Sequence, residues 1–325
     1  MRPAVTLRDR LCDESALDPG DGADFLQSVL DGLGRPQKVL DCKYLYDARG
    51  SVLFDEICRL PEYYPTRTET AILEAHAAAI AEAAGPGAEL VELGSGASVK
   101  TRILLSALDR PARYLPLDLA AGHMQAAATE LRRSYPGLVV QPLVADFAEP
   151  FALPPSREGG RRVLFFPGST IGNFDRDGAE RLLARLKRDL QADLFVIGVD
   201  LIKDVRVLHA AYDDAAGVTA AFNLNLLARI NRELGGDFDL AGFHHLARVD
   251  RGLGRVEMHL VSLADQQVRV GGRSFGFEAG ETIHTENSHK YAVDEFTALA
   301  ARAGWSGDAV WTDASRLFSV HLLRP

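Results

Sequence analysis

The stretch Leu90–Lys100 reads L-V-E-L-G-S-G-A-S-V-K, and it decides the fold. An apolar run of strand type breaks at Gly94-Ser95-Gly96 and then resumes with helical character. Glycines at such a break let backbone N–H groups approach a ligand that larger residues would exclude. The dinucleotide fingerprint needs a third glycine three residues after the second, but Val99 stands there. The loop therefore indicates an adenosine-bearing cofactor and matches the nicotinamide class only in part.

Strand and helix patterns alternate on either side of this stretch, which predicts a parallel sheet covered by helices on both faces. The ligand site of such a sheet lies at the carboxyl ends of its strands. The expected strands are Leu90–Leu93, Tyr114–Leu117, Val139–Val144, Val163–Phe166 and Leu194–Val199. The expected helices are Ala23–Leu33, Arg67–Ala84 after a capping box at Thr66–Glu69, Thr101–Leu108, Ala120–Ser134 and Gly178–Gln191.

The pattern changes after residue 202. Lys203–Leu234 is mostly helical in pattern, whereas Phe243–Leu263 alternates as a half-solvated antiparallel pair would. A loop at Glu286–Lys290, a helix at Val293–Ala303 and two short strands, Ala309–Trp311 and Phe318–Leu323, are expected to follow. We expect an α/β core at residues 67–201 and 293–325, and a second, α+β domain at residues 1–66 and 202–292 that binds the substrate and closes over it.

Composition narrows the class of partner. The chain of 325 residues has a net charge of -9 with both signs interleaved, which disfavours nucleic acid. No apolar run approaches the ~20 residues of a membrane span, and the first residues lack the apolar core of a signal peptide. Cys12, Cys42 and Cys58 form no CxxC pair, which favours reduced thiols. We expect a cytoplasmic monomer.

The histidines give no metal signal. His244 and His245 are adjacent on an expected strand and so point to opposite faces, and His284 and His289 have no familiar ligand spacing. We therefore expect no metal.

Two further strand ends carry acids. Asp118 ends the second strand about 20 residues after the loop, where a carboxylate binds ribose hydroxyls. Asp146-Phe147 follows the third strand and offers an acid for an exocyclic amine beside a ring for an adenine face. Each acid alone is as well explained as a helix cap. Together with the glycine-rich loop they favour adenosine.

This order resembles the class I S-adenosylmethionine-dependent methyltransferases, whose Rossmann-like core has a first strand ending E-x-G-x-G. The resemblance implies S-adenosylmethionine as the cofactor, S-adenosylhomocysteine as its product, and an antiparallel pair of strands at the end of the chain. The cofactor-binding residues that it implies are Glu92, Gly94, Ser95, Gly96, Lys100, Asp118, Asp146 and Phe147.

A narrower resemblance rests on four separated blocks. They are K-Y-L-Y-D-A-R-G-S at Lys43–Ser51, L-P-E-Y-Y-P-T-R at Leu60–Arg67, P-G-S-T-I-G-N-F at Pro167–Phe174 and T-E-N-S-H-K-Y at Thr285–Tyr291. The third block is no hydrolase elbow, because its central residue is Thr170 rather than serine. The blocks are similar to those of the histidine-specific Nα-methyltransferases of ergothioneine biosynthesis, which make hercynine by methylating L-histidine three times.

This resemblance implies a role for each residue of the acceptor site. The α-carboxylate is held by Asn173 and Tyr212, while the α-amine lies near Tyr46 and the backbone carbonyl of Gly168. The implied catalytic residues are therefore Tyr46, Asn173 and Tyr212. The implied imidazole contacts are Glu286, Ser288 and Tyr63, with Tyr64 as the alternative to Tyr63, and Met258 forms a wall.

Each assignment has a structural alternative. Met258 lies on an alternating strand and is core by default, Tyr212 could be a half-buried helix residue, and Glu286 and Ser288 could be loop surface. Within enzymes, the rival function is a related N-methyltransferase for another aromatic amino acid, such as a tryptophan derivative. The pair Glu286 and Ser288 disfavours it, because an indole offers one donor and no acceptor. Two further hypotheses are a protein that senses S-adenosylmethionine without catalysis and a nicotinamide oxidoreductase.

Overall fold

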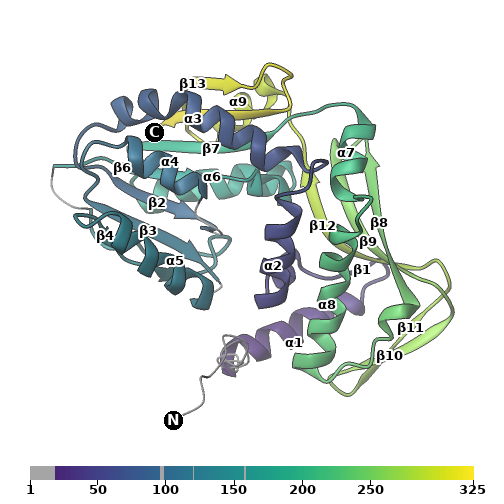
Figure 1. Cartoon of the computed structure of the whole chain (residues 1–325). Coiled ribbons are helices and arrows are strands. Elements are labelled where there is room, and N and C mark those ends of the chain that lie inside the picture. The colour runs from purple at the N-terminus through teal and green to yellow at the C-terminus, as the bar shows by residue number, and fades with distance from the viewer. Residues whose placement is uncertain (1–18, 96–98, 120, 157–158) are drawn as a thin grey trace, which may run out of the picture.

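The computed structural model describes residues 19–95, 99–119, 121–156 and 159–325. Two parts lie side by side (Figure 1). One is built on an eight-stranded sheet and the other on a four-stranded sheet with a separate hairpin.

The larger sheet has the strand order β13-β14-β7-β6-β2-β3-β4, and β5 also pairs with β3. Its strands are β2 (Glu89–Leu93), β3 (Arg113–Asp118), β4 (Val139–Val140), β5 (Leu143–Val144), β6 (Arg162–Phe166), β7 (Leu194–Asp200), β13 (Ser306–Thr312) and β14 (Phe318–Arg324). The pairs from β7 to β4 and β5 are parallel, whereas β14 is antiparallel to both β7 and β13. The predicted α/β fold with a parallel sheet and a terminal antiparallel pair of strands is confirmed.

Helices cover both faces of this sheet because side chains alternate along each strand. Leu90 of β2 packs with residues of α3 (Tyr64–Ala84), α4 (Val99–Ala107) and α5 (Ala121–Ser134). Its neighbour Val91 packs on the other face, with α6 (Arg176–Leu190) and α9 (Val293–Arg302). The central strands β2, β6 and β7 are consequently buried along their whole length.

The smaller part has a sheet of order β1-β12-β9-β8, beside which lies the hairpin β10–β11. Its strands are β1 (Lys38–Val39), β8 (Phe243–Asp250), β9 (Arg255–Ser262), β10 (Gln266–Val270), β11 (Arg273–Phe277) and β12 (Thr282–His289). Its helices are α1 (Pro19–Leu33), α2 (Ala48–Ile57), α7 (Val205–Tyr212) and α8 (Val218–Leu234), with 3-10 turns η2 (Cys42–Leu45) and η4 (Leu240–Gly242). Its buried apolar cluster draws on residues 25–64 and 208–283, apart from the clusters of the larger sheet.

Three local predictions are wrong. Glu286–His289 is not a loop but the end of β12, which pairs with β9 along its length and with β1 at its start. The expected strand Val139–Val144 is two short strands, since Pro142 between them has no N–H to give to a ladder. The expected capping box is absent, because α3 already begins at Tyr64 and Glu69 bonds elsewhere.

No helix in the described ranges is long and apolar enough to cross a membrane. The division into two domains at the predicted boundaries stays a prediction.

Candidate active site

The turn after β2 lies at the carboxyl edge of the larger sheet. Gly94 has a φ of 72°, a conformation that favours glycine. Its N–H donates to the carbonyl oxygen of Leu117 at 2.8 Å, which holds the turn against the end of β3. A Cβ at position 94 would lie 3.7 Å from the ring of Phe147, so the missing side chain keeps the space between turn and ring open. Ser95 is buried beside it, and Gly96 lies outside the described residues.

Glu92 is buried in β2 behind this turn. Its carboxylate accepts hydrogen bonds from Thr101 Oγ1 at 2.6 Å and from the hydroxyl of Tyr114. Burial raises the pKa of Glu92 to about 7, although both hydroxyls act to lower it. The structure thus gives Glu92 a role in joining α4 to two strands, and its contact with the cofactor stays a prediction.

Lys100 and Glu69 link two loops at this edge. The Lys100 ammonium forms an ion pair with the buried Glu69 carboxylate, which also accepts the backbone N–H of Gly168 at 2.8 Å. Glu69 therefore holds the helix after the first loop next to the loop after β6. Its role was missed because the sequence T-R-T-E suggested a helix cap.

The three remaining cofactor candidates, Asp118, Asp146 and Phe147, lie on the same edge. Asp118 is the last residue of β3. Asp146 follows β5, where it accepts the N–H of Ala148 at 2.8 Å and lies 3.3 Å from the Lys43 ammonium. The ring of Phe147 packs edge-on against Phe166, with centroids 5.2 Å apart. Asp146 therefore fixes a local turn and not the start of a helix, which its structural alternative had predicted.

A cavity of about 260 Å³ lies between this edge and the smaller sheet. Its walls come from α1, η2, β12 and the 3-10 turn η3 (Thr170–Asn173) after β6. The turn η3 packs closely on β12, since a Cβ on Gly172 would lie 2.8 Å from the backbone oxygen of His289. The lining residues are Ser28, Gly32, Arg35, Val39, Leu40, Asp41, Cys42, Asn173, His284, Thr285, Glu286 and Asn287.

Glu286 lines this cavity with a carboxyl group that its neighbours among the described residues do not stabilise by a hydrogen bond or an ion pair. No side-chain hydrogen bond or ion pair to its carboxyl group occurs within the part of the chain that the structure describes. Burial raises the pKa of Glu286 to about 7, against the opposing charge of Lys290. A half-buried acid without protein partners among the described residues is suited to accept a hydrogen bond from a ligand.

Aromatic rings line the region next to Glu286. Tyr46 packs edge-on against Phe222, with centroids 5.4 Å apart, and Tyr63 packs against Tyr212 at 6.3 Å. Burial raises the pKa of both Tyr46 and Tyr63 well above the ordinary value, and the Glu286 carboxyl adds to each shift.

Three other predicted residues have clear positions. Asn173 is the last residue of η3 and lines the cavity. Met258 is buried on β9 directly opposite Glu286 in the strand register. Tyr64 differs from Tyr63, because its hydroxyl donates to the Asp200 carboxylate at 2.7 Å.

A buried polar network backs this region. The Lys290 ammonium lies 2.6 Å from Asp200 Oδ2 and 2.7 Å from both the Tyr212 hydroxyl and Ser288 Oγ. The Tyr212 hydroxyl in turn donates to Ser288 Oγ at 2.7 Å. The sequence interpretation named Tyr212 and Ser288 but missed Asp200 and Lys290. The available signals were an acid ending the strand V-I-G-V-D and a lysine inside the block T-E-N-S-H-K-Y.

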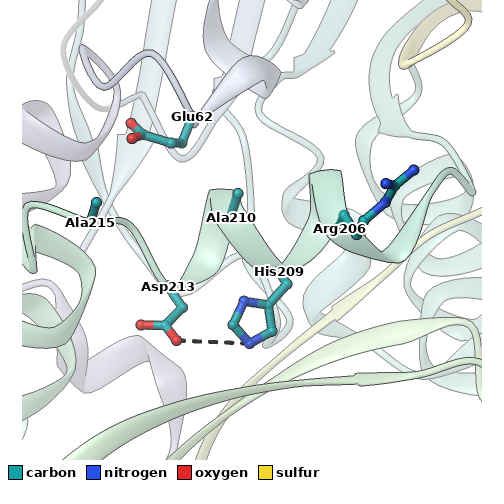
Figure 2. Close-up of a pocket in the computed structure, with 6 residues that line it drawn as sticks. All are labelled: Glu62, Arg206, His209, Ala210, Asp213 and Ala215. Atoms are coloured by element: carbon teal, nitrogen blue, oxygen red, sulfur yellow. Dashed lines mark ion pairs between the residues drawn. The ribbon is translucent and has the colours of Figure 1, made fainter.

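A second hollow, of about 370 Å³, opens beside α7 and contains none of the predicted site residues (Figure 2). Its lining residues are Glu62, Arg206, His209, Ala210, Asp213 and Ala215. The ion pair within it joins His209 and Asp213 at 3.8 Å, and both side chains are exposed. Exposed pairs of this kind contribute little to stability. Because Asn173 and Glu286 line the smaller cavity and no predicted site residue lines this hollow, the smaller cavity is the candidate active site.

Comparisons with known proteins bear on this site. The sequence profile of the family "Histidine-specific methyltransferase, SAM-dependent" matches residues 25–325. A histidine N-alpha-methyltransferase of Mycolicibacterium smegmatis is 44% identical over 91% of this chain and 93% of its own length. Its counterpart from Mycobacterium tuberculosis is 43% identical over the same shares. The ergothioneine biosynthesis protein 1 of Neurospora crassa is 30% identical over 92% of this chain, which corresponds to 35% of that longer protein.

The match extends from α1 to the last strand, so it includes both sheets and the cavity between them. The chain therefore belongs to the family of S-adenosylmethionine-dependent, histidine-specific methyltransferases.

Proposed function

We propose that this protein transfers three methyl groups from S-adenosylmethionine to the α-amino group of L-histidine, giving hercynine for ergothioneine biosynthesis. One observation carries the proposal from the structure. The Glu286 carboxyl group, unpartnered by protein within the described residues, shares a cavity with Asn173 at the carboxyl edge of the cofactor-type sheet. Family membership supplies the reaction class.

The residues at the sheet edge fit the cofactor. The fit is supported by the space between the turn after β2 and the Phe147 ring, which a side chain at position 94 would narrow. We assign the adenine to Asp146 and Phe147, the ribose hydroxyls to Asp118, and the rest of the cofactor to the turn at Gly94 and Ser95. When bound, S-adenosylmethionine supplies a methyl group on a sulfonium, which is electrophilic without help from a metal.

The acceptor side has to hold an amino acid with its amine facing that methyl group. Asn173 and Tyr212 would anchor the α-carboxylate, and the Gly168 carbonyl and Tyr46 would orient the amine. Such positioning is worth several orders of magnitude in rate. The imidazole would lie among Tyr63, Glu286 and Ser288 over Met258; the bond from Tyr64 to Asp200 supports Tyr63 over Tyr64 as the contact.

The amine loses a proton before each transfer. Burial raises the pKa of Tyr46 well above its ordinary value, so its phenol stays protonated at neutral pH. Tyr46 therefore acts as a hydrogen-bonding and relaying group rather than as a phenolate base. Water or the Gly168 carbonyl completes the path of the proton.

We also propose two domains, a cofactor core of residues 67–201 and 293–325 and a substrate domain of residues 1–66 and 202–292. The separate apolar clusters of the two parts support this division. A cavity between two such domains is a usual place for a small-molecule site.

Mass spectrometry of the purified protein with S-adenosylmethionine and all twenty amino acids tests the function. A gain of three methyl groups on histidine alone is the expected result. Unmodified histidine in the presence of bound cofactor would overturn the substrate assignment, and modification of tryptophan instead would favour the rival function.

A further inference from the structure

Lys290, the residue after β12, is a buried cation that the proposed function does not use. It is 1% exposed, and its ammonium contacts Asp200, Tyr212 and Ser288 at 2.6 to 2.7 Å. An ammonium has three N–H donors and no acceptor, so these three contacts use all of its capacity. Lys290 therefore cannot donate to a substrate without giving up one of them.

The charge of Lys290 is fixed by its neighbours. Burial by itself would lower the pKa of Lys290, but Asp200 and Tyr212 raise it to about 12. Burial would likewise raise the pKa of Asp200, which Lys290 and Lys203 hold below its ordinary value. The pair is ionised across the neutral range, so Lys290 donates to both hydroxyls throughout it.

These contacts fix the direction of the next hydrogen bonds. The Tyr212 hydroxyl accepts from Lys290 and gives its one proton to Ser288 Oγ at 2.7 Å. Ser288 Oγ then accepts from both Lys290 and Tyr212, which fills its two lone pairs. What Ser288 retains is its own proton, for which no acceptor occurs among the described residues.

Glu286 lies two residues before Ser288 on the same strand and offers a hydrogen-bond acceptor where Ser288 offers a donor. Residues i and i+2 share one face of a strand. An ionised carboxylate only accepts, whereas the locked serine only donates. One N–H and one bare nitrogen are what a neutral imidazole presents.

We propose that Lys290 is a positioning residue that locks Ser288 as a hydrogen-bond donor, so that the pocket takes the neutral imidazole ring in one tautomer. The N–H of that ring faces Glu286 and the bare nitrogen faces Ser288. This inference rests on the proposed function. It also revises the role proposed above for Tyr212: because its single proton is donated to Ser288, the N–H donors of the Asn173 amide, rather than the Tyr212 hydroxyl, hold the α-carboxylate.

A histidine analogue in which CH replaces the bare ring nitrogen, a pyrrolylalanine, tests whether Ser288 is held as a hydrogen-bond donor. With wild-type protein we expect its kcat/KM to fall at least a hundredfold below that of histidine, because the Ser288 proton would be buried unpaired. Lys290→Met removes the donor to both the Tyr212 and the Ser288 hydroxyl. In this variant we expect the ratio of kcat/KM for histidine to that for the analogue to fall at least tenfold, while the Kd of S-adenosylmethionine is unchanged.

Lys203→Met is the matched control. Lys203 also donates to Asp200, at 2.5 Å, but contacts neither Tyr212 nor Ser288 within the described residues. This variant should keep the wild-type ratio of kcat/KM between histidine and the analogue. The proposal would be overturned if Lys290→Met left that ratio unchanged, or if Lys203→Met lowered it by the same factor.

A measurement on wild-type protein covers the case in which Lys290→Met does not fold. Nitrogen-15 NMR of ring-labelled histidine, bound together with S-adenosylhomocysteine, should show one protonated and one bare ring nitrogen at pH 8, where the Glu286 carboxyl group is ionised. A bound imidazolium with two protons would contradict the lock. Wild-type protein that neither binds nor methylates histidine would instead refute the proposed function itself.

Discussion

The two sides of the active site are built in different ways. On the cofactor side, the carboxyl edge of one parallel sheet collects Gly94, Asp118 and Asp146 from strands that follow one another along the chain. On the acceptor side, Tyr46, Asn173 and Glu286 are separated by more than a hundred residues each and come from three different elements. The first side repeats a local strand-to-turn unit, whereas the second depends on how distant segments pack. A substitution on either side should therefore weaken the binding of one ligand, cofactor or acceptor, and leave the binding of the other unchanged.

The largest difference between the effect on the acceptor and the effect on the cofactor is expected for Asn173→Ala. Removing the amide that faces the acceptor cavity should lower kcat/KM for histidine about a hundredfold to a thousandfold, since misplaced reactants lose the gain from orientation. Isothermal titration should find the Kd of S-adenosylmethionine within about threefold of wild type. A parallel loss of cofactor affinity would mean that η3 supports the whole edge rather than the acceptor alone.

Gly94→Ala tests the opposite side. At a φ of 72° a side chain is strained by about 1 kcal/mol, and here it also enters the space facing Phe147. We expect roughly tenfold weaker binding of S-adenosylmethionine by titration.

Gly87→Ala is the control for Gly94→Ala, because Gly87 has a similar φ of 70° but no heavy atom within 4 Å of its would-be Cβ. The control should lose similar stability and keep its affinity. Equal affinity loss in both variants would show that strain alone explains the effect.

The pH dependence of stability probes the uncompensated carboxyl of Glu286. Its pKa is raised in the folded state to about 7, so the neutral form stabilises the fold below the unfolded pKa and this contribution is lost as pH rises toward 7. Glu286→Gln removes the penalty, and its free energy of unfolding should exceed that of wild type at pH 8 by up to about 3 kcal/mol. Urea unfolding at pH 5 and pH 8 measures this, and an identical difference between the two proteins at both values would contradict it.

The smallest effect is expected for Lys43→Ala. Its ion pair with Asp146 connects the two parts of the molecule, but at 3.3 Å and with Lys43 38% exposed it should be worth less than about 1 kcal/mol. Thermal unfolding should hardly change, and cofactor affinity should stay within about threefold. A tenfold change in that affinity would assign Lys43 to the cofactor site.

The same contrast explains what the sequence could predict. The parallel sheet followed from apolar runs and intervening amphipathic helices, because those patterns are local. The end of the acceptor strand β12 was mistaken for a loop, since T-I-H-T-E-N-S-H carries polar residues where a buried strand normally has apolar ones. Those polar residues serve the cavity and the network behind it, and functional sites are where local patterns break.

Long-range partners were the other limit. Glu69 looked like a helix cap, and only the fold brings it to Gly168 and Lys100. Asp200 and Lys290 are likewise ninety residues apart in sequence and 2.6 Å apart in space. The resemblance placed Glu286 and Ser288 in the site, but the lysine that orients Ser288 needed the structure.

The central claim is that the face of β12 selects histidine while the sheet edge binds the cofactor. A competition assay tests it most directly, with L-histidine and L-tryptophan at equal concentration, S-adenosylmethionine, and either wild-type protein or Glu286→Ala. We expect wild-type protein to methylate histidine alone, and Glu286→Ala to lose that preference to within about tenfold while its Kd for S-adenosylmethionine stays unchanged. An undiminished preference for histidine in Glu286→Ala, or an equal loss of cofactor binding, would contradict the account.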